Sequence, residues 1–395
     1  MDSSQLPPVN QTITDSSRQH HPSSRHPFSS LLFGPEAFYR NGNYLKSTKN
    51  DFSQKKPLPV SYSVKTERKI FRVVKQILSV VIFPIGLYKL IHSFIGRYIL
   101  PASSATISKL PLNYGQQARE KFANNLTEDE EWKYKRFTIE VDGNKIDAAI
   151  MGKVSTFANG RWLLNSNGNC QFYEDILAGD DVREFKRILM TIDSNAIMFN
   201  YPGVGASSGV PSQDTMVKAY KAIMALLENK EDGIGAQEII GYGHSIGAGV
   251  QGEFLKKARL KDDIKYVFVK SRTFSDLPAE IASVTSRLLG FVARIFGWNM
   301  GSVESSKRLQ VPEIILQTAR VPKTQEFADA AQIRHDDIIA PEASLAHALL
   351  KDKHGTAKKN GNKVFIGIRE GHNQTLNHWT VSMLSDKIKS FLNTP

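Results

Sequence analysis

From Arg136 onward, short apolar runs alternate with segments of helical periodicity. The first two runs flank Asp142-Gly143 in RFTIEVDGNKIDAAIMG, and an Asp-Gly pair suits a two-residue hairpin turn. The further strands expected are WLL from 162, AIMF from 196, EII from 238, YVFV from 266, EIIL from 313 and KVFIGI from 363, with helices near 172–190, 212–229, 247–258, 342–351 and 379–393. This alternation predicts an α/β fold with a mostly parallel sheet, helices on both faces and ligands at the carboxyl ends of the strands.

The N-terminal third follows a different pattern. Residues 1–66 are rich in Ser, Pro, Asn, Gln and Lys without a sustained apolar period, so we predict that they are largely disordered. Residues 67–130 form a second segment with an apolar, basic-edged stretch at 69–101, and residues 131–395 form the α/β domain. The longest charge-free run within residues 69–101, Gln76 to Tyr88, has 13 residues and contains Pro84. It is too short for a membrane-spanning helix, which needs about 20 apolar residues.

Two interpretations of residues 69–101 remain open. In the first, two short helices broken near Pro84 cover the core of the main domain. In the second, an amphipathic hairpin lies on an anionic bilayer surface, with a row of basic side chains near the headgroups. The basic side chains concerned are Lys65, Arg68, Lys69, Arg72 and Lys75.

The distribution of charge narrows the possible partners. The net charge is +12, and residues 1–100 hold 14 Lys and Arg against 5 Asp and Glu. Because the basic character is concentrated beside apolar residues there, the pattern favours an anionic membrane surface over nucleic acid as a partner, and we expect no nucleic-acid binding. The start, MDSSQLPPVNQ, has no apolar core of a signal peptide, and the single cysteine, Cys170, excludes an intrachain disulfide.

The pattern Gly-x-Ser-x-Gly occurs twice, and its context differs between the two copies. Ser245 lies in EIIGYGHSIGAGVQGEFLKKA, which supplies a strand, a sharp turn and a helix in that order. This is the arrangement of a nucleophile elbow, in which small residues must flank the serine. Ser207 lies in a Gly-rich loop about seven residues beyond its strand. We therefore predict that Ser245 is the nucleophile and that Ser207 is structural.

A nucleophilic serine needs a base and an acid, which follow it in the order acid, then histidine. His372 opens the loop after the last strand and is the expected base. Asp336 is the expected acid, with Asp337 and Asp329 as alternatives, because a long insertion separates them from the strand EIIL. The oxyanion hole is expected from the backbone N–H groups of Ile246 and Asn169. We expect neither a metal nor another cofactor.

These motifs resemble those of the α/β-hydrolase superfamily. NGN at 167–169 stands where related hydrolases carry His-Gly-Asn, and NYPGVGASSG, RTFSDL, GHSIGAG and EGHN resemble other loops of that fold. More narrowly, FPIGLYKLIHSFIGRYILPAS, VDGNKIDAAIMG and APEASL resemble the chlamydial CHLPS family of uncharacterised hydrolase-like proteins. The resemblance implies a host-associated bacterial source. It suggests a location in the bacterial cytoplasm, at the membrane periphery or, after delivery, in a host cell, and it supplies no substrate.

Residues 277–301 are the expected site of a small helical cap, with apolar residues at helical spacing: Ile281, Val284, Leu288, Val292 and Ile295. An apolar cap beside an apolar, basic N-terminal segment favours a small-molecule or lipid ester as substrate. We therefore expect a serine hydrolase that acts on carboxylester, lipid or thioester bonds. A serine peptidase or amidase and a non-catalytic binding module with the same fold are the alternatives.

Overall fold

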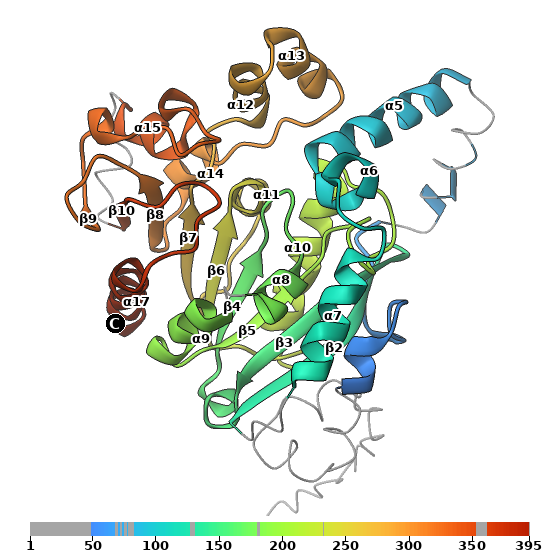
Figure 1. Cartoon of the computed structure of the whole chain (residues 1–395), viewed down its shortest axis with the longest axis horizontal. Helices are drawn as coiled ribbons and strands as arrows, with labels where there is room; N and C mark the ends of the chain where they lie inside the picture. Colours follow the sequence, from blue (N-terminus) through green and yellow to red (C-terminus); the bar gives the residue numbers. More distant parts are fainter. Residues whose placement is uncertain are drawn as a thin grey trace, which may run out of the picture.

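The computed structural model describes residues 49–394, apart from 68–69, 72, 75–76, 78–82, 127–130, 180–181, 232 and 353–361. Ten strands of this part of the chain form one sheet, in the spatial order β1-β2-β3-β5-β4-β6-β7-β8-β10-β9 (Figure 1). They span Val60–Val64 (β1), Trp132–Val141 (β2), Asn144–Lys153 (β3), Arg161–Ser166 (β4), Asn195–Phe199 (β5), Glu238–His244 (β6), Lys265–Ser271 (β7), Glu313–Thr318 (β8), Gln325–Glu326 (β9) and Lys363–Ile368 (β10).

Most of the sheet is parallel, as predicted. All neighbouring pairs from β5 to β10 run parallel, whereas β3 runs antiparallel to β2 and β5, and β9 runs antiparallel to β10. The predicted hairpin joins β2 to β3, with Val141 opposite Asn144. Asp142 and Gly143 have φ values of 49° and 85°, which a two-residue hairpin turn requires.

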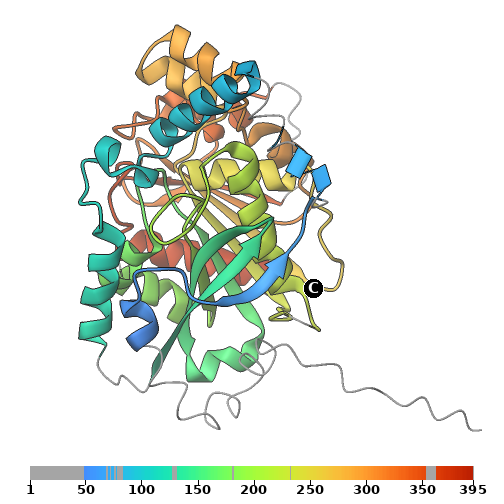
Figure 2. The ribbon, with the colours of Figure 1, turned by 90° about the vertical axis from the view of Figure 1, so that its right-hand side faces the viewer.

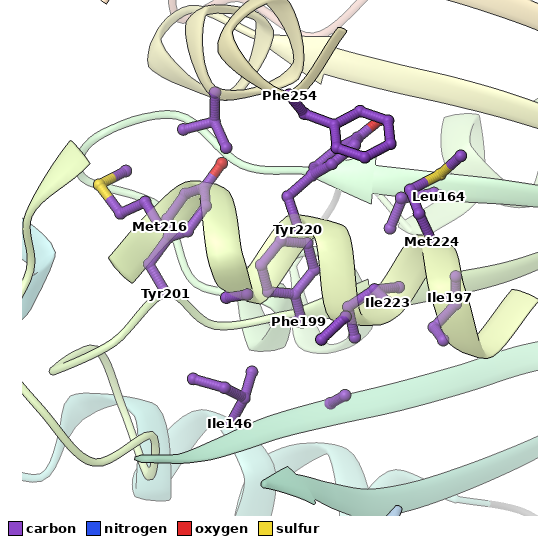
Figure 3. Packing of buried hydrophobic residues seen from close by; sticks show 14 of the residues in the cluster. Ile146, Leu164, Ile197, Phe199, Tyr201, Met216, Tyr220, Ile223, Met224 and Phe254 are labelled. Atoms are coloured by element: carbon purple, nitrogen blue, oxygen red, sulfur yellow. The ribbon is translucent and has the colours of Figure 1, made fainter. Parts of the chain in front are cut away.

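Helices cover both faces of the sheet, and residues that alternate along the strands face opposite layers. On one face, α10 (Gln213–Glu228) packs through Met216, Tyr220 and Ile223 against strand residues such as Leu164 and Phe199 (Figure 3). The other face is covered by α8 (Tyr173–Ala178), α9 (Val182–Thr191) and α17 (His378–Asn393), whose apolar residues join those of the strands. The predicted helix at 172–190 is therefore two helices, α8 and α9.

Several shorter elements complete the edge of the sheet at which the parallel strands end. The helix α11 (Ile246–Leu255) follows β6 directly. The two cap helices, α12 (Leu277–Val284) and α13 (Arg287–Ile295), follow β7, and the predicted small helical cap is therefore present (Figure 1). The 3-10 turn η2 (Val154–Asn159) joins β3 to the start of β4 and so lies at the opposite edge. Further elements are α14 (Val303–Arg308), the 3-10 turns η3 (Ala330–Gln332) and η4 (Pro341–Ala343), and α15 (Leu345–Leu350).

Residues 49–66 contain regular structure, although we predicted that residues 1–66 are largely disordered. Residues 49–53 form a short helix with Phe52 fully buried, and β1 pairs in parallel with β2. The Arg136 guanidinium of β2 donates to the backbone carbonyls of Asp51 and Gln54. These residues gain their partners from β2, a strand that lies far along the chain. Residues 1–48 lie outside the described residues.

The segment predicted at 67–130 packs on the α/β domain. It contains α5 (Phe83–Ile99), η1 (Pro101–Ser103), α6 (Ala105–Ser108) and α7 (Tyr114–Asn125), and α5 lies beside the cap helices (Figure 2). Pro84 falls in the first turn of α5, and Leu100 is fully buried in the core. Within the described chain, no helix is both long enough and apolar enough to cross a membrane. The basic residues Arg68, Lys69, Arg72 and Lys75, which belong to the membrane-hairpin interpretation, lie outside the described residues.

Candidate active site

Ser245 lies at the tip of the sharp turn between β6 and α11. Its φ and ψ are 54° and −122°, a strained conformation for a residue with a side chain. A Cβ added at Gly243 would lie 2.6 Å from the Ala248 Cα, and one added at Gly247 would lie 2.1 Å from the Ser166 carbonyl oxygen. Only glycine fits at both positions without moving the backbone. The strand, turn and helix therefore form the elbow that the sequence predicts.

The structure brings Ser245, His372 and Asp336 together in one hydrogen-bonded chain. The Ser245 Oγ lies 3.0 Å from His372 Nε2, and His372 Nδ1 lies 2.9 Å from Asp336 Oδ2. All three residues are buried. This geometry allows the imidazole to accept the serine proton while the carboxylate holds it in the required orientation.

Asp336 reaches the site because the insertion before it forms a closed loop. The Arg334 N–H donates to the Thr318 carbonyl at 3.2 Å, and Ala319 bridges Ile333, so the chain returns to the end of β8 after the insertion. The Asp336 Oδ1 accepts hydrogen bonds from the N–H groups of Ile338 and Ile339, at 3.1 and 2.6 Å.

The same contacts set the protonation state of the Asp336 carboxyl. Burial raises its pKa, but the interaction with His372 and the two backbone donors outweigh burial and lower the pKa below its usual value. The carboxylate is therefore ionised at neutral pH. The alternative Asp337 is exposed, and Asp329 caps η3.

The two predicted oxyanion donors lie on the loops that flank the nucleophile. Ile246 begins α11, and Asn169 lies in the loop after β4. Within the described chain, neither N–H donates a backbone hydrogen bond, so both remain available to a substrate oxygen. Asn169 is exposed. Its backbone carbonyl accepts a 3.2 Å hydrogen bond from the backbone N–H of Ala102 in η1. The N-terminal segment thus contacts the loop that bears Asn169.

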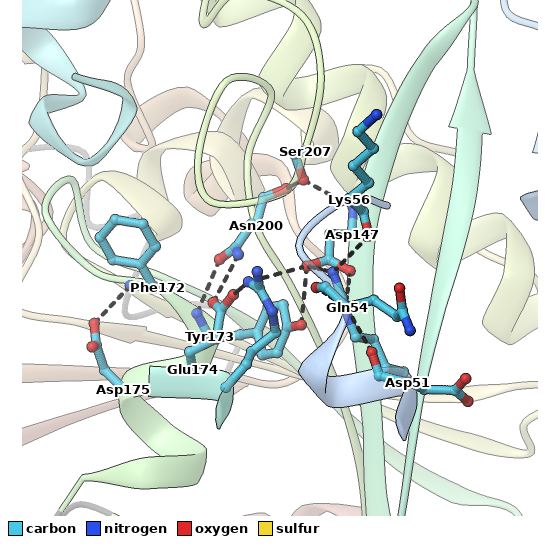
Figure 4. A network of polar contacts seen from close by, with 12 residues as sticks. Asp51, Gln54, Lys56, Asp147, Phe172, Tyr173, Glu174, Asp175, Asn200 and Ser207 are labelled. Carbon is cyan, nitrogen blue, oxygen red and sulfur yellow. Dashed lines mark hydrogen bonds and ion pairs between the residues drawn. The ribbon is translucent and has the colours of Figure 1, made fainter. Parts of the chain in front are cut away.

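Ser207, the centre of the second Gly-x-Ser-x-Gly pattern, has a structural environment. Its Oγ donates to the Asn200 carbonyl and accepts from the Asp147 N–H, each at 2.9 Å. Asp147 belongs to a buried polar network that also holds Arg136 through its guanidinium (Figure 4). The network fixes the loop after β5 and joins β3 to α8, which directly follows the loop bearing Asn169.

A cavity of about 120 Å³ lies beside His372, between the His loop, β4, β6, α8 and α9. The side chains of Asn167 and His244 line it, and within the described chain Asn167 Nδ2 and His244 Nδ1 have no hydrogen-bond partner. Burial, followed by the charges of Arg272 and His372, lowers the pKa of His244 well below its usual value, so its ring is neutral. The centroid of the His244 ring lies 5.0 Å from that of His372.

Arg272 is a site residue that the sequence did not single out. Its backbone has a φ of 45°, and its buried guanidinium donates to the carbonyls of Gly371 and Gln374 at 2.5 and 2.7 Å. These two carbonyls flank His372, so Arg272 fixes the loop that carries the imidazole. The sequence feature that could have indicated Arg272 is its position in RTFSDL, directly after β7.

A second unexpected group is Glu280 of the cap helix α12. The side chain is buried, and neither carboxylate oxygen has a hydrogen-bond partner within the described chain. Burial, followed by the charge of Asp336, raises the pKa of Glu280 to about 7.

As for metals, the described residues include no cluster of three or more His, Cys, Asp or Glu that could hold an ion.

The strand order, the elbow at Ser245 and the chain order Ser, Asp, His define the α/β-hydrolase fold. The chain belongs to the family described as Chlamydia CHLPS protein (DUF818), whose profile matches residues 43–393. The predicted resemblance to both is thereby confirmed. No curated protein matches the sequence.

Several solved structures are similar in fold at low sequence identity. The Pyrococcus furiosus esterase Pf2001 is 15% identical, with 66% of this chain and 90% of that chain covered and a TM-score of 0.46. An α/β hydrolase from Vibrio vulnificus is 14% identical, with 66% and 80% covered and a TM-score of 0.46. Est1E from Butyrivibrio proteoclasticus, solved with ferulic acid bound, is 13% identical, with 65% and 97% covered and a TM-score of 0.43.

Proposed function

We propose that the protein is a serine hydrolase that cleaves an ester bond through a Ser245-His372-Asp336 triad. The observation that carries this proposal is the continuous hydrogen-bonded chain from the Ser245 Oγ through both nitrogens of His372 to Asp336. A strained serine at an elbow supports the same assignment, as do the N–H groups on both flanking loops, which donate no backbone hydrogen bond within the described chain.

In the proposed reaction, the Ser245 Oγ attacks the ester carbonyl while His372 Nε2 takes its proton. The N–H groups of Ile246 and Asn169 stabilise the negative oxygen of the tetrahedral intermediate. The intermediate collapses when His372 returns the proton to the departing alcohol, which leaves an acyl group on Ser245. A water molecule, deprotonated by His372, then attacks the acyl-enzyme and releases the acid.

The test is hydrolysis of p-nitrophenyl esters with acyl chains from two to twelve carbons, with the anilides of the same acids beside them. We expect ester hydrolysis by the wild type and its loss in Ser245→Ala and His372→Ala. The matched control is Ser207→Ala, which removes the centre of the other Gly-x-Ser-x-Gly pattern. This control should lose about 1–3 kcal/mol of stability with its two hydrogen bonds but keep the activity.

The outcomes separate the three function classes. Preferential anilide cleavage that depends on Ser245 would identify an amidase or peptidase instead. Hydrolysis that survives in Ser245→Ala, or no hydrolysis of any substrate by a folded wild type, would overturn the proposal. The second of these results would favour a binding module.

A further inference from the structure

Two helical elements above the active-site edge expose large apolar side chains to solvent. On α5, Leu90 and Phe94 are 68% and 65% exposed, and on α13, Leu288 and Phe291 are 68% and 61% exposed. We call this surface the apolar face. Its exposed members are Leu87, Tyr88, Leu90, Ile91, Phe94 and Tyr98 on α5, and Val284, Leu288, Leu289, Phe291 and Ile295 on α12 and α13. Contiguous exposed apolar surface of this kind marks an interaction site.

The two halves of the apolar face are held together by aromatic contacts. The rings of Tyr88 and Phe296 stack with centroids 5.2 Å apart, and the ring of His92 lies 6.3 Å from that of Trp298. Figure 2 shows α5 lying alongside α12 and α13 at the same end of the molecule. The helices therefore present one surface, and α12 follows directly after β7, at the edge of the sheet that holds the triad.

The exposed charged side chains of these helices are all basic. The sequences of α5 and α13 contain no acidic residue, and Glu280, the acidic residue of α12, is buried. Arg97 and Arg287 are exposed, as is Arg294, which pairs with the cap residue Asp276. An apolar surface with basic residues among its members complements an anionic lipid surface.

We propose that the apolar face docks on an anionic lipid bilayer and presents the active site to ester lipids at its surface. This deepens the proposed function by naming the class of substrate, and it rests on that function only for the hydrolysis step. The exposed apolar side chains enter the interface while the arginines contact phosphate headgroups. Docking of this kind needs no membrane-spanning helix.

A second copy of the chain is a weaker occupant of the same surface. In a symmetric dimer the same patch meets itself. Two copies of the apolar face would bring Arg97 and Arg287 together with their counterparts, and Asp276, the acidic cap residue, already pairs with Arg294; anionic headgroups supply the missing negative charge.

The proposal can be tested with full-length Ser245→Ala protein and vesicles, so that binding is measured without turnover. Co-sedimentation is measured with vesicles of phosphatidylcholine containing 30% phosphatidylglycerol and with phosphatidylcholine alone. We expect binding to the anionic vesicles, at least tenfold weaker binding to the neutral ones, and weakening by added salt. No binding to anionic vesicles would overturn the proposal.

Two variants and one control localise the effect. Replacing Leu90, Phe94, Leu288 and Phe291 by Ser should reduce vesicle affinity at least a hundredfold, and replacing Arg97 and Arg287 by Gln should reduce it about tenfold. The control replaces Met190 and Trp379, exposed apolar residues on α9 and α17, by Ser and should leave binding unchanged. An equal loss in the control would overturn the assignment to the apolar face.

Two further measurements keep the outcomes distinct. If sedimentation velocity shows a dimer that the four Ser substitutions abolish while vesicles are not bound, the face is a self-association surface and the lipid proposal is wrong. With active protein, the four Ser substitutions should lower hydrolysis of an ester lipid in anionic vesicles at least tenfold and leave hydrolysis of a soluble short-chain ester unchanged. Failure of the soluble-ester reaction in the wild type would instead contradict the proposed function.

Discussion

Replacing Asp336 by Asn tests its proposed role as the triad acid, because the contacts of the carboxylate fix how the amide must lie. The Asp336 Oδ1 accepts two backbone N–H groups, so the amide oxygen of the Asp336→Asn variant must take that place. The amide NH₂ then occupies the position of Oδ2, 2.9 Å from His372 Nδ1. Two donors would face each other unless the imidazole moves its proton from Nδ1 to Nε2.

That change of tautomer removes the base. A proton on His372 Nε2 prevents this nitrogen from accepting the Ser245 proton across the 3.0 Å hydrogen bond. The same exchange in a triad protease lowers kcat by about 10⁴, which corresponds to about 5.5 kcal/mol of transition-state stabilisation. We expect a loss of about 10³ to 10⁴ in kcat/KM for Asp336→Asn, with only a small change in melting temperature because the backbone contacts remain.

The assay is kcat/KM on the best p-nitrophenyl ester, run beside a thermal melt. The matched control is Asp337→Asn: Asp337 is exposed and has a φ of 82°, a conformation that Asn tolerates well, so its activity should stay within about threefold of the wild type. Asp329→Asn keeps a capping side chain on η3 and should behave likewise. An Asp336→Asn protein within tenfold of the wild type, with a large loss in Asp337→Asn, would refute the reasoning.

Three further predictions concern the elbow, the buried network and the cap. Gly247→Ala should cost about 3 kcal/mol of stability and most of the activity, because its Cβ would meet the backbone of β4, the strand before the loop that bears Asn169. The control Gly115→Ala, whose Cβ contacts would be 3.3 Å or longer, should cost less than about 1 kcal/mol. Both free energies of unfolding are measured by denaturant titration. Arg136→Met should cost about 3–5 kcal/mol, because it removes the nearest cationic partner of the buried Asp147 and leaves only the more distant Arg119 at 3.9 Å; a loss below 1 kcal/mol would contradict this. The pKa of Glu280 is raised from 4.5 to about 7, so the folded wild-type protein is destabilised as pH rises through this window and the buried carboxyl ionises. The Glu280→Gln variant does not ionise there, so its free energy of unfolding should rise by up to about 3 kcal/mol relative to the wild type between pH 4.5 and 8. The exposed control Glu342→Gln should show no such pH-dependent gain.

The sequence allowed the elbow and the hairpin to be predicted because their parts are adjacent in the chain. Gly243, Ser245 and Gly247 lie within five residues, and the steric limits at the turn act among these residues and the strand beside them. The hairpin at Asp142-Gly143 depends on the backbone freedom of the two turn residues. In both cases a local rule determines the structure.

The site and the fold were harder to predict where partners lie far apart in sequence. The choice of Asp336 over its neighbours depends on how the insertion after β8 closes, which is set by contacts between residues 318–320 and 332–334. The strands β1 and β9 lie at the two edges of the sheet, and β9 has only two residues. A two-residue strand cannot show a period, and the apolar–polar alternation of β1, VSYSV, covers only five residues.

The cap shows the limit of periodicity. The helical spacing of Val284, Leu288 and Ile295 indicated an apolar face but not whether that face is covered. In the structure all three are exposed, while the neighbouring Gly290 and Ala293 face inward. Which residues of a short cap helix pack inward depends on where the cap sits on the domain, and the sequence of the helix does not contain that information.

The most direct test of the triad is covalent labelling with a fluorophosphonate, followed by intact-mass measurement and peptide mapping. An activated serine reacts once per chain, so we predict one adduct on Ser245 in the wild type and in Ser207→Ala. His372→Ala should label at least a hundredfold more slowly, and Ser245→Ala should not label at all. A folded wild type that takes up no label, or an adduct on a serine other than Ser245, would contradict the central claim.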